Sequence, residues 1–174
     1  MKKNKIIWFL LCIVFLVGCS IEQSFEKFFK QEMTKKHTGE KNYSYSLIHT
    51  ELNAVHDGDA IAVFKEQNNQ GKQIFIAYFE KENNQWKWKQ TRGAEWDSPV
   101  KWSSMQQEPY IYSGTLSDKS IDEVFASDEP GKIINVEDGK RFWYVISPIK
   151  DAEVTMVKED GTKEIIEEIN HEEL

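Results

Sequence analysis

The middle of the chain alternates apolar and polar residues with a period of two, and this pattern constrains the fold more than any other feature. Runs rich in β-branched and aromatic residues cover 43–55, 60–66, 73–80 and 86–91. Short turns that contain Gly, Asn or Asp separate them, which is typical of hairpins between antiparallel strands. The third run is almost continuously apolar, as in a strand that is covered on both faces. We therefore predict an antiparallel meander from Tyr43 to Arg92.

An amphipathic helix is predicted before the meander. Its single apolar stripe consists of Ile21, Phe25, Phe28, Phe29 and Met33, which are spaced as on one face of an α-helix. The polar stretch 35–42 then forms a turn or short linker. Two positions are open for this helix: it lies in a membrane interface, or it packs on the sheet that follows. The glutamates among the stripe favour packing, because they dilute the positive face that interfacial helices carry.

The last third of the chain returns to strand patterns. Five strands are expected at 110–116, 133–137, 141–147, 153–158 and 163–169. Asp138-Gly139 and Asp160-Gly161 are expected to be hairpin turns, and Ser120–Ala126 to form a helical turn. The segment 93–108 has no clean period and contains Pro99, which predicts a 16-residue irregular connection. Such long loops are functional or mark a boundary between subdomains.

Together these patterns predict an α+β fold, mostly antiparallel β, with one N-terminal helix followed by eight or nine strands. The strands form one domain or two small lobes, and the first lobe has a cystatin-like arrangement of a helix on a sheet. That analogy concerns the fold alone and implies no function. The expected segments are 1–18, a signal; 19–42, the helix and linker; 43–107, the meander with its loop; and 108–174, a β-rich region with an acidic tail.

The N-terminus has the pattern of an export signal. A basic stretch, Met1–Lys5, precedes the uninterrupted apolar run Ile6–Val17, and this order is that of a secretory signal peptide. The run is shorter than the roughly 20 residues that a membrane-spanning helix needs. It ends in Leu16-Val17-Gly18-Cys19, which resembles the lipobox of bacterial lipoproteins.

The resemblance implies that Cys19 receives a diacylglycerol group and that the signal is cleaved after Gly18. The mature protein would then be anchored at the outer face of the cytoplasmic membrane, since two acyl chains hold a protein there stably. Cys12 would leave with the signal, so disulfides and thiolate catalysis would be excluded. The C-terminal pattern of Tyr110–Gly114, Arg141–Tyr144 and Glu159–Gly161 is similar to small uncharacterised lipoproteins of Gram-positive spore-formers.

Charge narrows the classes of partner. The chain has 22 basic and 29 acidic residues, and removal of Lys2, Lys3 and Lys5 with the signal leaves 19 basic ones, a net charge of −10. Nucleic acids and anionic lipid surfaces require a basic face. We therefore expect no nucleic-acid partner, and contact with the membrane through the lipid on Cys19.

The sequence contains no common catalytic or phosphate-binding motif. His56-Asp57-Gly58-Asp59 groups an imidazole with two carboxylates, but the spacing matches neither a calcium loop nor a zinc pattern. A hairpin turn explains these residues more economically, so we expect no metal and no cofactor. Glu95 and Asp97 form a carboxylate pair of the kind that glycosidases use.

Aromatic residues provide a further candidate site. Trp96, Trp102 and Tyr110 lie in or beside the irregular segment, where they form a binding surface for a partner or fill the junction between lobes. The leading expectation is a non-catalytic binding or accessory module that meets a protein or a cell-wall component. One alternative is an extracytoplasmic hydrolase centred on Glu95, Asp97 or the His56 turn. Another is an immunity or inhibitor protein, suggested by the acidity and the first lobe.

Overall fold

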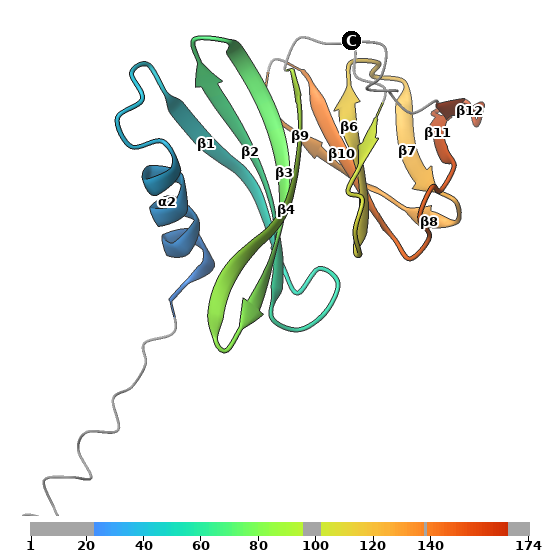
Figure 1. Cartoon of the computed structure of the whole chain (residues 1–174). Coiled ribbons are helices and arrows are strands. Elements are labelled where there is room, and N and C mark those ends of the chain that lie inside the picture. Colours follow the sequence, from blue (N-terminus) through green and yellow to red (C-terminus); the bar gives the residue numbers. More distant parts are fainter. Residues whose placement is uncertain (1–22, 96–101, 138, 167–174) are drawn as a thin grey trace, which may run out of the picture.

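The computed structural model describes residues 23–95, 102–137 and 139–166 (Figure 1). One helix, α2 (Phe25–Lys36), precedes the strands. Twelve strands lie within the described residues: β1 (Ser44–Leu52), β2 (Asp59–Asn68), β3 (Gly71–Glu82), β4 (Gln85–Glu95), β5 (Ser103–Ser104), β6 (Tyr110–Leu116), β7 (Ile121–Ala126), β8 (Glu129–Pro130), β9 (Lys132–Asn135), β10 (Arg141–Ser147), β11 (Val154–Lys158) and β12 (Lys163–Ile166). Their pairings are all antiparallel, so the predicted α+β class with mostly antiparallel strands is confirmed.

The strands form three sheets of four. Sheet A has the order β1-β2-β3-β4 and is the predicted meander. Sheet B has the order β5-β6-β10-β9, and sheet C has the order β12-β11-β7-β8. The central pairing of each later sheet, β6 with β10 and β7 with β11, joins residues that are distant in sequence.

The helix and the three sheets stack as four layers (Figure 1). One core lies between α2 and sheet A, a second between sheets A and B, and a third between sheets B and C. Alternation along the strands explains this, because successive side chains point to opposite faces. In β3, Ile74 and Ile76 face sheet B, whereas Ala77 and Phe79 face the helix. The continuously apolar run therefore belongs to a strand buried on both faces, as predicted.

The helix packs on sheet A, which is the second of the two alternatives. Phe25, Phe29 and Met33 are all buried against the sheet. The helix begins at Phe25 because Ser24 is its N-cap, with a side chain that accepts a hydrogen bond from the Lys27 N–H at 3.4 Å. None of the helices in the described residues has both the length and the apolar character that crossing a bilayer requires.

The prediction of a helical turn at Ser120–Ala126 is wrong, because Ile121–Ala126 is strand β7. Ile121 and Val124 are both buried although they lie three residues apart, a spacing that regular strand alternation does not give. A register shift between Val157 and Lys158 of β11 accounts for it: Glu123 pairs with Val157, but Ile121 pairs with Lys158. The extra residue in β7 interrupts the alternation of the strand, so that Ile121 and Val124 face the same core although they lie three residues apart.

The irregular connection predicted at 93–108 is shorter in the structure. Strand β4 continues to Glu95, and Ser103–Ser104 pairs with β6 as β5. The extension of β4 depends on Gly93, where a Cβ atom would lie 2.4 Å from a ring carbon of Phe75. Glycine is the residue that admits such close approach within a strand. Residues 96–101 lie outside the described residues.

Candidate functional site

Asp59 organises the turn between β1 and β2. Its carboxylate is fully buried and accepts hydrogen bonds from the backbone N–H groups of Ala54 (2.7 Å), Val55 (3.0 Å) and His56 (2.8 Å). Gly58 has a positive φ of 85°, which glycine adopts readily. These bonds are those of the turn predicted for His56-Asp57-Gly58-Asp59. Across the residues that the structure describes, no group of three or more His, Cys, Asp and Glu side chains is arranged to hold a metal ion.

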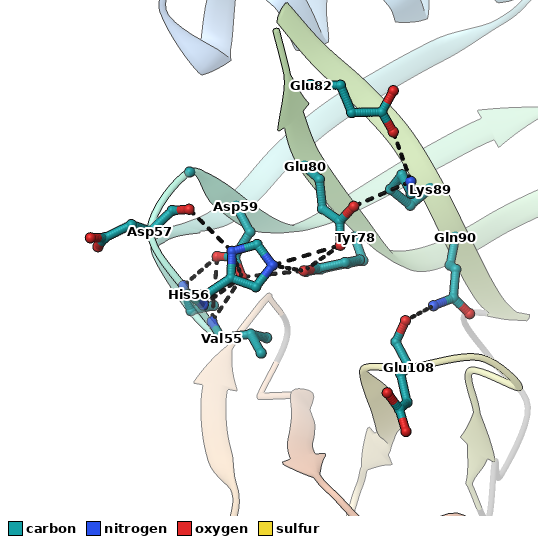
Figure 2. A network of polar contacts seen from close by, with 12 residues as sticks. Val55, His56, Asp57, Asp59, Tyr78, Glu80, Glu82, Lys89, Gln90 and Glu108 are labelled. Atoms are coloured by element: carbon teal, nitrogen blue, oxygen red, sulfur yellow. Dashed lines mark hydrogen bonds and ion pairs between the residues drawn. The ribbon is translucent and has the colours of Figure 1, made fainter. Parts of the chain in front are cut away.

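A network of polar side chains extends from this turn across sheet A (Figure 2). The Tyr78 hydroxyl lies 3.0 Å from Glu80 Oε1, 3.3 Å from Asp59 Oδ2 and 3.3 Å from His56 Nε2. Lys89 Nζ lies 3.2 Å from Glu80 and 2.9 Å from Glu82. The hydroxyl has one proton, so it donates to one carboxylate at a time. The network thus joins the β1–β2 turn to β3 and β4.

The surroundings of Tyr78 and Glu80 fix their protonation states. Burial, together with the charges of Asp59 and Glu80, raises the pKa of Tyr78 far above its usual value. Partial burial acts to raise the pKa of Glu80, but hydrogen bonds from Lys89 and Tyr78 outweigh it, and the pKa is lowered. At neutral pH the tyrosine is therefore a hydrogen-bond donor and the glutamate a carboxylate.

His56 is the exposed member of the network. Its side chain is 55% exposed, and Nδ1 lies 3.1 Å from the Asp57 carbonyl oxygen. That hydrogen bond raises the pKa of His56, and the charges of Asp59 and Glu80 act in the same direction. Both ring nitrogens of a protonated imidazole are donors, and here one faces a carbonyl and the other faces the Tyr78 hydroxyl.

The network borders a cleft at the end of the interface between sheets A and B. The cleft has a volume of about 580 Å³, which is within the usual range for ligand pockets. The β1–β2 turn, β3, the residues before β6, β8 and the C-terminal end of β10 contribute to it. The lining residues are Val55, His56, Tyr78, Glu80, Glu108, Pro109, Glu129, Ile146, Ser147 and Pro148. We call this the intersheet cleft.

Hydrogen bonds between the two sheets hold the walls of the intersheet cleft in place. The Gln90 side chain of β4 donates to the carbonyl oxygens of Gln107 (2.9 Å) and Glu108 (3.3 Å). Arg92 Nε donates to the Ser104 carbonyl oxygen at 2.6 Å. Figure 2 shows Glu108 below the strand that carries Gln90. The segment that supplies Glu108 is therefore fixed to sheet A before any ligand binds.

A larger hollow of about 690 Å³ lies between α2 and the β3–β4 turn. Its polar lining consists mainly of exposed amides and lysines, and Gln23 and Gln31 hydrogen-bond to each other at 2.7 Å. Its aromatic residues, Phe28, Trp86 and Trp88, belong to the core between the helix and sheet A. We prefer the intersheet cleft as the candidate site, because His56, Tyr78 and Glu80 form one network beside its apolar walls.

The structure separates the aromatic residues singled out in the sequence. Trp102 is 5% exposed, packs in the core between sheets B and C, and donates a hydrogen bond from Nε1 to the Ile166 carbonyl oxygen at 2.7 Å. Tyr110 is half-buried against the same core. Trp102 therefore fills a core, which is the second of the two alternatives, and does not form an exposed binding surface. Trp96 lies outside the described residues.

The remaining sequence predictions fall mostly outside the described residues. This holds for Asp97 and for Cys19, while the backbone of Glu95 ends strand β4. A hydrolase centred on Glu95 and Asp97 therefore stays a prediction, as does an immunity or inhibitor protein. Among the predicted groups, His56 is the one that lines the intersheet cleft.

Sequence reasoning missed Tyr78, Glu80, Glu108 and Glu129 as cleft residues. Their strands were mostly identified, but the order of the strands across three sheets was not. One signal was available: Pro109 and Pro148 flank predicted strands, and strand ends that meet at one edge often form sites. Comparisons of this chain with family models, curated proteins and solved structures found no match.

Proposed function

We propose that this protein is a membrane-anchored extracytoplasmic lipoprotein that acts as a non-catalytic binding module through its intersheet cleft. The observation that carries the binding proposal is the cleft itself, where three carboxylates, those of Glu80, Glu108 and Glu129, meet apolar walls. Pockets that combine apolar surface with a few fixed polar groups are typical ligand sites. The proposed partner is a protein or a cell-wall component.

The protonation states of Tyr78 and Glu80 support a role in recognition rather than in proton transfer. A general acid or base is most effective when its pKa lies near the working pH. The pKa of Glu80 is shifted down and that of Tyr78 is shifted up, so both move away from neutrality. At neutral pH Glu80 therefore stays a negatively charged acceptor and Tyr78 stays a neutral donor, and constant roles of this kind suit a fixed binding surface.

Attachment of lipid at Cys19 is proposed from the sequence Leu16-Val17-Gly18-Cys19. Five residues, Ser20–Ser24, separate this cysteine from α2, and an extended chain of that length reaches at most roughly 18 Å. The first turn of α2 and the β1–β2 turn lie at the same end of the molecule (Figure 1). An anchored protein would therefore hold its intersheet cleft close to the bilayer, and a partner would be met there.

Metabolic labelling with an alkyne analogue of palmitate tests the anchor. We expect the native chain to incorporate the label and to sediment with membranes. Cys19→Ala should abolish the labelling and leave an unprocessed precursor. Cys12→Ala is the matched control, because its thiol lies within the apolar run, and it should behave as the native chain. Labelling and normal processing of Cys19→Ala would contradict the anchor.

Site-specific photocrosslinking in intact cells tests the binding module. A benzophenone amino acid at Val55, which is 43% exposed at the intersheet cleft, should form discrete adducts. The same probe at Ile165, 65% exposed on β12, is the control for non-specific capture. We expect the Val55 adducts to weaken when Glu108→Gln is added. Identical adducts from both positions, unaffected by this substitution, would contradict binding at the cleft.

A further inference from the structure

We propose that the intersheet cleft binds a peptide segment in which a lysine or arginine stands beside an apolar residue. This inference rests on the proposed function, since it names the class of ligand for the same cleft. The cationic group would lie among Glu80, Glu108 and Glu129, and the apolar neighbour would pack on the walls of the cleft.

The charges of the intersheet cleft favour a cation. Its described lining contains three glutamates and neither lysine nor arginine. His56 adds a positive charge only when it is protonated, and the buried Asp59 lies 3.7 Å behind it. Lys89 contacts Glu80 from outside the lining, whereas Glu108 and Glu129 are exposed at the mouth. A ligand with a positive side chain therefore meets an excess of carboxylates, which is electrostatically complementary.

The apolar surface of the cleft argues for a peptide rather than for a simple inorganic cation. Pro109, Ile146 and Pro148 line the cleft beside the glutamates. Val55 is 43% exposed, and Ile149, which directly follows Pro148, is 51% exposed. Exposed apolar groups rimmed by polar residues mark interaction sites. Lysine and arginine also have apolar stems that pack on such walls while the charged end reaches the carboxylates.

Groups fixed within the cleft make the arrangement selective. The Glu80 carboxylate accepts a hydrogen bond from the Tyr78 hydroxyl at 3.0 Å, and the backbone at Glu108 is held by Gln90. Groups fixed before binding lower the entropy that a ligand must lose on ordering them. An acidic segment would add negative charge beside the three glutamates of the lining, and like charges brought together are strongly disfavoured. The cleft therefore selects the sign of the charge as well as apolar character.

A random heptapeptide library displayed on phage, selected on the purified full chain, tests the proposal. We expect enrichment of peptides in which Lys or Arg adjoins an apolar residue. The double variant Glu108→Gln/Glu129→Gln should bind synthetic copies of these peptides about 2- to 25-fold more weakly, since each exposed ion pair is worth up to about fivefold. The double variant Glu26→Gln/Glu123→Gln removes the same charge elsewhere and should bind them as the native chain does.

Lys89→Met provides a test in the opposite direction. This substitution removes the lysine that competes for Glu80 but retains its apolar stem, so the enriched peptides should bind about two- to fivefold more tightly. Lys119→Met is the charge-matched control. This exposed lysine follows the C-terminal end of β6, whereas Pro109 of the cleft precedes the N-terminal end of that strand. Unchanged or weaker binding in Lys89→Met would contradict the placement of the cation beside Glu80.

The outcomes separate this inference from the proposed function. Enriched peptides that lack basic residues, yet lose binding when Val55→Trp blocks the cleft, would overturn the basic-segment inference and keep the binding module. If neither Val55→Trp nor substitution of the glutamates weakens the binding of any enriched peptide, both the basic-segment inference and the binding module are overturned. Circular dichroism and urea unfolding of every variant identify any substitution that acts by unfolding the chain.

Discussion

The two faces of sheet A are both buried, yet they are built from different side chains. Towards α2 the core is aromatic: Phe29 packs against Phe64 with ring centres 5.1 Å apart, and Phe79 packs against Trp88 at 4.7 Å. Towards sheet B the core is mostly aliphatic, with Ile61, Val63, Ile74 and Ile76. The helix covers the first face with buried aromatic side chains, whereas the second face opens into the intersheet cleft.

Two neighbouring residues of β3 show what this difference means. Phe79 is fully buried on the helix side, within a cluster of aromatic rings. Tyr78 places its ring in the aliphatic core, but its hydroxyl reaches the network of Asp59, Glu80 and His56. Tyrosine combines an apolar body with a polar end. We infer that the helix face of the sheet provides stability, whereas the other face provides stability and also lines the candidate site.

Phe29→Ala should have the largest effect and should test whether the helix face acts on stability alone. Phe29 is 1% exposed, and its ring contacts those of five other aromatic residues. Removal of a buried phenylalanine ring costs about 3–5 kcal/mol in the free energy of unfolding. Urea unfolding measures this loss. The half-buried Phe28→Ala on the same helix is the control and should cost less.

The comparison would fail if Phe29→Ala also altered the intersheet cleft. The ring lies on the opposite face of sheet A from His56, so the NMR signals of the His56 imidazole should stay at their native positions in the folded variant. Displaced signals would show that the two faces are coupled through the sheet.

Asp59→Ala should have the next largest effect, and this time on the cleft face. The buried carboxylate accepts three backbone hydrogen bonds, and its loss leaves those donors unsatisfied. We expect a loss of about 2–4 kcal/mol in the free energy of unfolding. The exposed Asp57→Ala in the same turn should change it by less than about 0.5 kcal/mol. Equal losses in the two variants would contradict the structural role of Asp59.

The sequence predicted the elements of the fold that depend on local patterns, but it did not predict the candidate site. The helix, the meander and the strand ranges could be predicted because alternation and turn residues are local signals. Asn83 and Asn84, for example, both have positive φ in the β3–β4 turn, as an Asn-rich hairpin implies. Burial of the strand at 73–80 on both faces could also be predicted from its composition. These features depend on residues that are close together in the chain.

The candidate site depends on residues that are far apart. Val55, Tyr78, Glu108 and Glu129 meet only because sheet B combines β6 with β10 and sheet C combines β7 with β11. No local pattern specifies this order of strands. Trp102 illustrates the same limit, since its hydrogen bond to Ile166 spans 64 residues. A tryptophan in a segment without periodicity was therefore compatible with a binding surface or with a core.

Protonation of His56 should have the smallest effect on stability, since more than half of its imidazole is exposed and water screens its interactions. The hydrogen bond to the Asp57 carbonyl oxygen and the charges of Asp59 and Glu80 raise its pKa in the folded state. Because the folded pKa lies above the unfolded value of about 6.5, the stabilisation is fully present below that pH. It is lost as the pH rises through the folded pKa.

An NMR titration of the His56 ring should give a pKa above 6.5 in the native chain and a lower one in Glu80→Gln, which removes one of the charges that face the imidazole. Glu26→Gln, on the helix side of sheet A, should leave the His56 pKa unchanged. This difference would confine the electrostatic effect to the cleft face, where His56 and Glu80 lie. If both variants lowered the pKa equally, the shift would arise from the overall negative charge, and the functional distinction between the two faces would lose its electrostatic basis.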